Sequence, residues 1–215
     1  MKEIFNKYIN NEIKLEKWQK IGIICLVIVI SGIFGWIYEY IFYFFNSGMK
    51  QFYWRGANFL PWINIYATGS IMIILLTHKT KKNPLYVFLI SAISTGILEY
   101  LTGLAMYKLM GGIRCWDYNT EILNFGNIDG FVCLRSVTFF GLSALLLIYC
   151  IVPFCIYLSK KMNRHTFMAF SITICFIFLF DEFYNLLFAK MLNLPRSAEI
   201  YKNIGIKYMD YYKNK

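Results

Sequence analysis

Apolar runs long enough to cross a membrane constrain the fold of this chain more than any other feature. Residues 21–45 contain a single charged side chain, Glu39. A helix of this length rises ~37 Å at ~1.5 Å per residue, which exceeds the ~30 Å hydrocarbon core of a bilayer. Backbone groups in lipid must bond within their own segment, and the runs lack the apolar–polar alternation of membrane β-strands. The sequence therefore predicts an all-α membrane protein.

Five segments of this kind predict a polytopic transmembrane helical bundle. The expected spans are residues 21–45, 60–78, 85–107, 132–158 and 166–189, in a single transmembrane domain over residues 21–189. Residues 1–20 place lysines beside aliphatic and aromatic residues, which is typical of an amphipathic segment on the membrane surface. We expect residues 190–215 to form a basic tail at the membrane interface.

The formal net charge of +10 follows from 22 basic and 12 acidic residues. The basic residues lie between and beside the spans, so we expect membrane lipids as partners and no nucleic acid. The positive-inside rule places the N-terminus and the basic connectors, residues 78–84 and 159–165, in the cytoplasm. Five spans then leave the basic tail outside. A re-entrant segment with an even span count is the alternative, and it stays open.

Ionisable residues inside the spans point to a functional site, because each costs ~2.5–3.5 kcal/mol on insertion scales. With this topology the acidic residues of three outward-running spans and a basic residue of an inward-running span fall near the outer leaflet, as do both long loops. The predicted polar site comprises Glu39, Arg55, Glu99, Arg114, Trp116, Asp117, Tyr118, Arg135, Asp181 and Glu182. The alternative for each residue is structural, as a buried ion pair that fixes helix register or as a cap of a loop turn.

An internal similarity links two of these spans. Residues 31–40 and 91–100 align without gaps at an offset of 60, with five of ten residues identical, and both segments end in Glu-Tyr. Each is followed by a loop and a returning span. This pattern predicts a tandem helix–loop–helix repeat, with chance similarity of apolar segments as the alternative.

Motifs for soluble catalysis and for metals are missing from the sequence. There is no Gly-x-x-x-x-Gly-Lys-Ser/Thr loop for ATP and no Gly-x-Ser-x-Gly nucleophile. There is no Cys-x-x-Cys pair, and the two histidines lie in separate connectors. We therefore expect no catalytic residue, no cofactor and no metal, and the chain is more typical of a non-enzyme. The redox state of Cys115 and Cys133 stays open.

Short motifs surround the polar residues. Gly35 and Trp36 precede Glu39, and Leu98-Glu99-Tyr100 leads to Trp116-Asp117-Tyr118. Other positions of the same pattern are Arg55, Gly56, Pro61, Ile65, Tyr66, Gly69, Asn127, Gly130, Cys133, Leu134 and Pro153. Over residues 35–153 the chain resembles a family of bacterial membrane proteins described as ABC-transporter permeases of type IV (CmpB-like). It departs from the family pattern at Trp54, Asn64, Tyr107 and Phe131, where Asn, Pro, an acidic residue and Arg are usual.

The resemblance implies a permease subunit in the bacterial plasma membrane, with its N-terminus in the cytoplasm and a separate ATP-binding subunit as partner. We expect an unknown substrate to move through a site lined by the intramembrane carboxylates. The alternatives are an intramembrane enzyme acting on a lipid-linked substrate and a structural or regulatory membrane subunit. Homo-oligomerisation also stays open.

Overall fold

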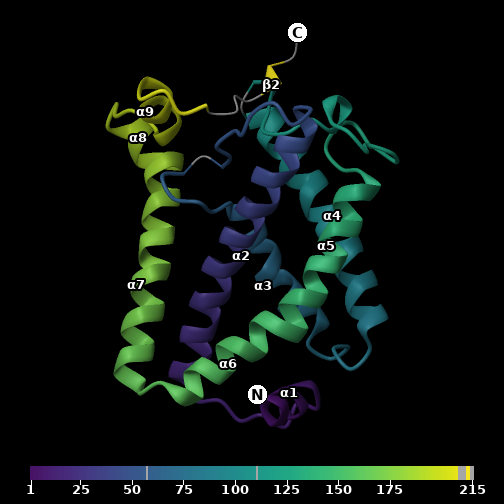
Figure 1. Ribbon diagram of the computed structural model, residues 1–215, viewed down its shortest axis with the longest axis vertical. Coiled ribbons are helices and arrows are strands. Elements are labelled where there is room, and N and C mark those ends of the chain that lie inside the picture. The colour runs from purple at the N-terminus through teal and green to yellow at the C-terminus, as the bar shows by residue number, and fades with distance from the viewer. Residues whose placement is uncertain (57, 110, 208–211, 214–215) are drawn as a thin grey trace. The chain divides into compact units, whose positions relative to one another are not determined.

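The computed structural model describes residues 1–56, 58–109, 111–207 and 212–213 of the chain, and these residues are mainly helical (Figure 1). Four helical segments are long and apolar enough to cross a membrane: Lys17–Asn46, Pro84–Leu109, Leu134–Lys161 and Arg164–Met191. The first two are α2 and α4. The third consists of α5 (Leu134–Leu146), the π-helix η2 (Leu147–Ile151) and α6 (Val152–Lys161). The fourth consists of α7 (Arg164–Phe183), the π-helix η3 (Tyr184–Phe188) and α8 (Ala189–Met191).

Shorter elements complete the described chain. They are α1 (Lys2–Ile9), α3 (Asn64–Thr77), the 3-10 helix η1 (Tyr118–Thr120), α9 (Ser197–Asn203) and two strands, β1 (Ile113–Arg114) and β2 (Tyr212–Lys213). The strands pair antiparallel, Ile113 opposite Lys213 and Arg114 opposite Tyr212. The all-α fold predicted from the apolar runs is confirmed.

The second expected span is shorter than predicted. Residues 60–78 were expected to be helical, but α3 has 14 residues, Asn64–Thr77. At ~1.5 Å per residue it rises ~21 Å, less than the ~30 Å hydrocarbon core. The reason is that residues 60–63 belong to a loop that lies well below the end of α2, as described for the site below.

The chain forms two compact units, which are described separately. Of the described residues, the first unit combines Met1–Ile71 with residues 147–207, and the second comprises Met72–Leu146 together with the β2 residues. The boundaries fall inside α3 and at the junction of α5 with η2.

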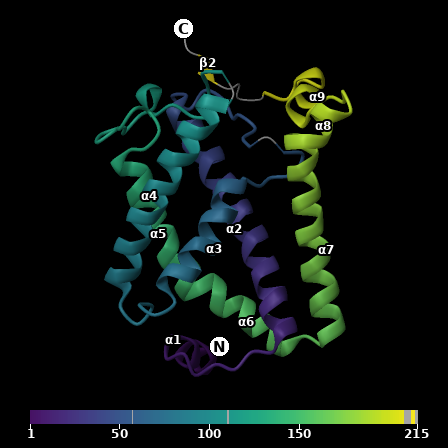
Figure 2. The ribbon, with the colours of Figure 1, turned by 180° about the vertical axis from the view of Figure 1, so that it is seen from behind.

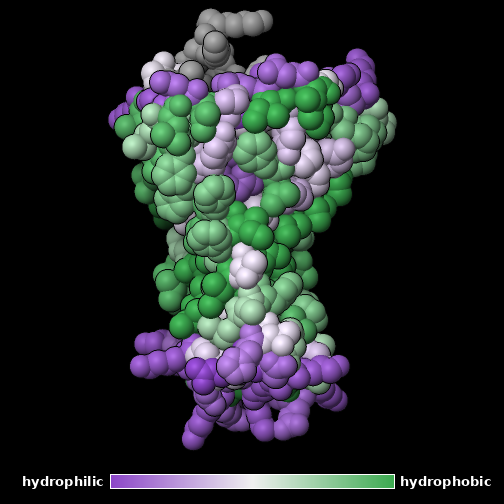
Figure 3. Space-filling view, turned by 90° about the vertical axis from the view of Figure 1, so that its left-hand side faces the viewer, coloured by the Kyte–Doolittle hydropathy of each residue, from purple (hydrophilic) through white to green (hydrophobic). Residues whose placement is uncertain are grey.

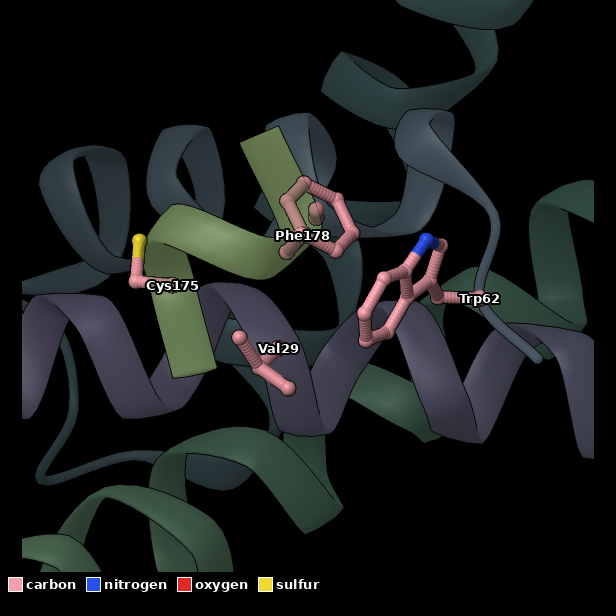
Figure 4. Close-up of a cluster of buried hydrophobic side chains, with 5 residues drawn as sticks. Val29, Trp62, Cys175 and Phe178 are labelled. Atoms are coloured by element: carbon pink, nitrogen blue, oxygen red, sulfur yellow. The ribbon is translucent and has the colours of Figure 1, made fainter. Parts of the chain in front are cut away.

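The core of the first unit forms where α2 packs on α7 (Figures 1 and 2). Glycines on α2 allow two close contacts: Gly22 lies against the ring of Phe167 from α7, and Gly35 lies against the ring of Tyr66 from α3. A buried cluster of Val29, Trp62, Ala67, Cys175 and Phe178 fills the space between them (Figure 4). Small residues at such contacts let membrane helices pack closely, since lipid supplies little hydrophobic drive for their association.

The outer face of α7 is apolar. Exposed aromatic residues along it include Phe170, Phe176, Phe180 and Phe183. On the side of the molecule that α7 occupies, hydrophobic residues cover the middle and hydrophilic residues gather at both ends (Figure 3). This distribution is that of a helix whose outer surface contacts lipid and whose ends contact water and headgroups.

The second unit is built on the antiparallel pair α4 and α5. Gly96 meets Val137, and Gly141 meets Phe88 and Ala92. The opposite face of α4 carries exposed aliphatic residues four positions apart, namely Leu85, Leu89, Ile93, Ile97 and Leu101. A spacing of four keeps these side chains on one stripe of the helix, which we interpret as facing lipid.

Gly35 gives a test of the close approach between α2 and α3. A methyl group at Gly35 would collide with ring carbons of Tyr66, whereas one at Gly69 on α3 would meet nothing within 4 Å. We expect Gly35→Ala to lower the free energy of unfolding by about 1–3 kcal/mol, as overpacking does. Gly69→Ala should leave it unchanged or slightly raised, because Ala favours helix. Thermal unfolding of both variants in one detergent would measure this, and equal melting temperatures would contradict the packing described.

Candidate functional site

The first unit contains a partly buried ion pair between α2 and the loop that follows it. The Arg55 Nε lies 2.9 Å from Oε2 of Glu39, and these side chains are 9% and 17% exposed. The hydroxyl of Tyr66 donates to Oε1 of Glu39 at 3.4 Å, and the guanidinium of Arg55 lies 3.9 Å from the centroid of the Tyr43 ring. Removing one partner of such a pair leaves an uncompensated charge, so both residues are constrained together. The structure thus brings two predicted site residues into contact.

The loop over residues 47–63 descends far below the end of α2. The N–H of Ile63 donates to the carbonyl of Gly32 at 3.0 Å. Gly32 lies fourteen residues before Asn46, the last residue of α2. At ~1.5 Å per residue this corresponds to ~21 Å along the helix axis. Irregular backbone at membrane depth is tolerated only where protein groups or a water-filled cavity satisfy its polar atoms.

Asp181 on α7 satisfies part of this loop backbone. Its Oδ1 and Oδ2 accept the N–H groups of Phe59 and Leu60, each at 2.9 Å. Asn185, one turn further on, donates to the Asp181 Oδ1 at 2.9 Å. Asp181 is 5% exposed. This carboxylate therefore anchors the loop to α7, which is a structural role for a predicted site residue.

Glu182 anchors the same loop through a side chain. Its Oε1 accepts the amide of Asn58 at 2.7 Å, and Asn58 also donates to the carbonyl of Trp62 at 3.2 Å. Sequence reasoning missed Asn58, since a polar loop residue between Trp54 and Pro61 carries no signal of its burial. Its 3% exposure comes from packing with α7, which is remote in sequence.

The segment after α8 covers this loop. The hydroxyl of Tyr201 in α9 donates to the carbonyl of Phe59, and its ring lies 5.2 Å from that of Trp54. The N–H of Trp54 donates to the carbonyl of Lys207 at 2.8 Å. Burial raises the pKa of Tyr201, and the nearby Asp181 carboxylate adds to the effect, so the phenol remains a donor at neutral pH.

Glu99 is a buried carboxylate of the second unit. It is 4% exposed and lies on α4 in line with the buried Ser91 and Thr95, as the predicted polar stripe requires. Tyr118 donates its hydroxyl to Oε1 of Glu99, and Ser136 on α5 donates to Oε2 at 2.8 Å. Both of these donors are hydroxyl groups, which rotate and can both donate and accept.

Arg135 pairs with a residue that sequence reasoning did not include. Its Nη2 donates to Oε2 of Glu121 at 2.7 Å, and its guanidinium lies 5.1 Å from the centroid of the Tyr118 ring. Glu121 is 5% exposed. Tyr118 therefore connects the Glu99 carboxylate with the Arg135–Glu121 ion pair.

The remaining predicted residues fold the loop between α4 and α5. Arg114 donates from Nη1 to the carbonyl of Asp129 at 2.6 Å, and its guanidinium lies 4.3 Å from the centroid of the Phe131 ring. Trp116 donates its indole N–H to the carbonyl of Phe131 at 2.9 Å. Asp117 accepts the N–H of Asn119 at 3.1 Å and so caps η1. Such side-chain to backbone bonds are typical of turns.

The two units share one pattern. In each, a glutamate of the repeated segment, Glu39 or Glu99, accepts a hydroxyl bond from a tyrosine further along the chain, Tyr66 or Tyr118. The ten predicted residues thus fall into two groups, one in each unit. The prediction that both groups line a single site stays a prediction. Within the described ranges, no three His, Cys, Asp or Glu side chains gather so as to hold a metal ion.

Long apolar helices with buried, hydrogen-bonded carboxylates define an integral membrane protein with several spans. A family model described as "Putative ABC-transporter type IV" matches residues 26–186, which is most of the chain. The chain belongs to this family, as the motifs around Glu39 and Glu99 predict. No curated protein and no solved structure matches it significantly.

Asp181 can be tested as the anchor of the loop. Asp181→Ala should leave the N–H groups of Phe59 and Leu60 without their acceptor, which costs about 1–3 kcal/mol for each buried group. Asp181→Asn retains one carbonyl oxygen as an acceptor. Its melting temperature and its rate of proteolysis should therefore lie between those of Asp181→Ala and those of the natural chain. Melting temperature in detergent and the rate of proteolysis within residues 47–63 would report both changes.

Glu199→Ala is the matched control, because this carboxylate is exposed on α9. It should leave both measurements unchanged. The anchoring role is refuted if Asp181→Ala has the same melting temperature as the natural chain and if protease cleaves its loop no faster.

Proposed function

We propose that the chain is the membrane-embedded subunit of a transporter, and that Glu99 and Glu39 contact the substrate or a coupled ion on its path. The observation that carries this proposal is the environment of Glu99. An ionisable residue in a span is costly to insert and marks a pathway or proton relay by default. Glu99 receives hydroxyl donors from Tyr118 and Ser136, and a rotation of the Tyr118 hydroxyl away from the carboxylate would leave room for a substrate group.

The carboxylates have different roles in this proposal. Asp181 and Glu182 serve the loop over residues 47–63, so we do not assign them to the path. Glu39 is held by Arg55, and opening that pair would expose a carboxylate and a guanidinium together. We assign Glu99 as the primary group and the Glu39–Arg55 pair as a second, gated group.

Energy for transport is proposed to come from a separate ATP-binding subunit. The family description supports this partner, and the chain itself lacks a phosphate-binding loop. With the N-terminus in the cytoplasm of a bacterial cell, as we propose from the positive-inside rule, the basic connectors face the compartment that contains ATP. In the connector over residues 159–165, Lys160 and Lys161 are exposed and available to a partner.

The partner is tested by mild purification of the tagged chain from its native membrane, followed by mass spectrometry. We expect a nucleotide-binding protein in near-stoichiometric amount that is lost when purification is repeated in harsh detergent. A tagged, unrelated membrane protein from the same cells serves as the control. Recovery of the chain with lipid alone would overturn the ABC part of the proposal.

Glu99→Gln tests the path itself. The amide keeps the shape of the side chain but removes its charge, so we expect normal accumulation in the membrane. We expect ATP hydrolysis by the purified complex to fall about tenfold or more, which corresponds to ~1.4 kcal/mol. Glu12→Gln, at an exposed position near the N-terminus, is the control and should have no effect.

Three results separate the roles of Glu99. Loss of hydrolysis with normal accumulation supports the path. Failure to accumulate assigns Glu99 to structure, and unchanged hydrolysis in a folded complex refutes its role in transport.

A further inference from the structure

An apolar groove lies between α1 and the η2–α6 part of the third span, within the first unit. Its volume is about 560 Å³, which falls in the range of ~300–1,000 Å³ typical of small-molecule sites. Lining residues include Lys2 and Phe5 from α1, Tyr149 and Ile151 from η2, and Pro153 and Phe154 from α6. The rings of Phe5 and Tyr149 are 6.3 Å apart. In both ribbon views α1 lies beside the end of the molecule toward which α6 runs (Figures 1 and 2).

The groove has a cause in the sequence. Pro153 has no backbone N–H and its ring conflicts with the carbonyl four residues earlier, that of Tyr149. The helix responds with the π-helical turn η2 immediately before α6. Such widened turns are frequent at functional positions. The groove lies at this turn, with η2 and the start of α6 on one side and α1 on the other.

The groove combines an apolar lining with basic residues. Lys2 is the charged residue of the lining, which is otherwise almost entirely apolar. Two further basic residues lie on the elements that form the groove, Lys7 on α1 and Lys160 at the end of α6. Lys7 is neutralised by Glu3, so Lys2 and Lys160 carry the positive charge. Lys7 forms an ion pair with Glu3 at 2.6 Å. Lys7, and more weakly Lys160 at the end of α6, hold the pKa of Glu3 below its ordinary value, which places Lys160 near α1.

A positive rim on an apolar groove is complementary to a lipid with a negative headgroup. The α6 helix, which contacts α1, ends at Lys161 after two consecutive lysines, so the groove lies near the end of the third span, where hydrocarbon gives way to headgroups. Basic groups at the cytoplasmic surface attract the anionic lipids of that leaflet. A soluble anion would leave the apolar lining unused, and a neutral lipid would leave the basic rim unused.

We infer that this groove binds one anionic phospholipid, with an acyl chain between Phe5 and Pro153 and the headgroup at Lys2. The bound lipid completes the contact between α1 and α6. It thereby fixes the amphipathic helix against the third span. This site is independent of Glu39 and Glu99, and its test does not depend on transport.

The test uses the full chain in detergent, titrated with dioleoyl-phosphatidylglycerol or with dioleoyl-phosphatidylcholine, and native mass spectrometry counts the bound lipids. We expect one phosphatidylglycerol to be retained at a concentration at least tenfold below that needed for phosphatidylcholine. Lys2→Glu should weaken phosphatidylglycerol binding about tenfold. Lys14→Glu is the matched control, since it changes the net charge equally at an exposed residue outside the groove.

A second variant tests the apolar part. Cys150 also lines the groove and is exposed, so Cys150→Trp should fill the space and displace the lipid tail. Loss of the single tightly bound lipid supports the site. Equal retention of both lipids by the natural chain, or equal effects of Lys2→Glu and Lys14→Glu, would overturn it. Because Lys2 is at the surface of a short helix, its variant remains informative if Cys150→Trp does not fold.

Discussion

The carboxylate of Asp181 determines how deeply the first loop enters the protein. By accepting the N–H groups of Phe59 and Leu60, it replaces the water that this backbone would otherwise require. The depth of the loop in turn allows α3 to be only 14 residues long, because its first turn starts beside the middle of α2. Trp62 then reaches the core cluster with Phe178, at a ring separation of 5.1 Å. A single acidic residue on α7 thus influences the length of another helix and the composition of the core.

In both units a loop contacts a buried carboxylate, but the donors of the hydrogen bonds differ. In the first, the backbone N–H groups of the loop engage Asp181, and the guanidinium of Arg55 engages Glu39. In the second, hydroxyl groups engage Glu99, and the nearby guanidinium of Arg135 is bonded to Glu121. The carboxylates of the two units therefore have different kinds of partner: backbone and guanidinium donors in the first, and hydroxyl donors in the second.

Much of this architecture follows from local patterns. Apolar length predicts the four long spans, and the four-residue spacing of Ser91, Thr95 and Glu99 predicts the buried stripe on α4. The length of α3 does not follow, because it depends on a bond between residues 122 positions apart. The partner of Arg135 was equally unpredictable: Glu121 lies in a polar loop, and only the folded loop removes it from water. Helix periodicity describes contacts within a segment, whereas long loops are organised by residues from elsewhere.

The cover that α9 places over the loop has a consequence for biosynthesis. Tyr201 bonds to Phe59 across 142 positions, and Asp181 does so across 122. At about 5–20 residues per second, a ribosome needs roughly 6–24 s to make the chain between Phe59 and Asp181. During that interval the N–H groups of Phe59 and Leu60 lack the acceptor that they have in the folded chain. Residues 47–63 can therefore make their final contacts only after α7 has been synthesised, so the first loop of the chain is among the last parts of the unit to be completed.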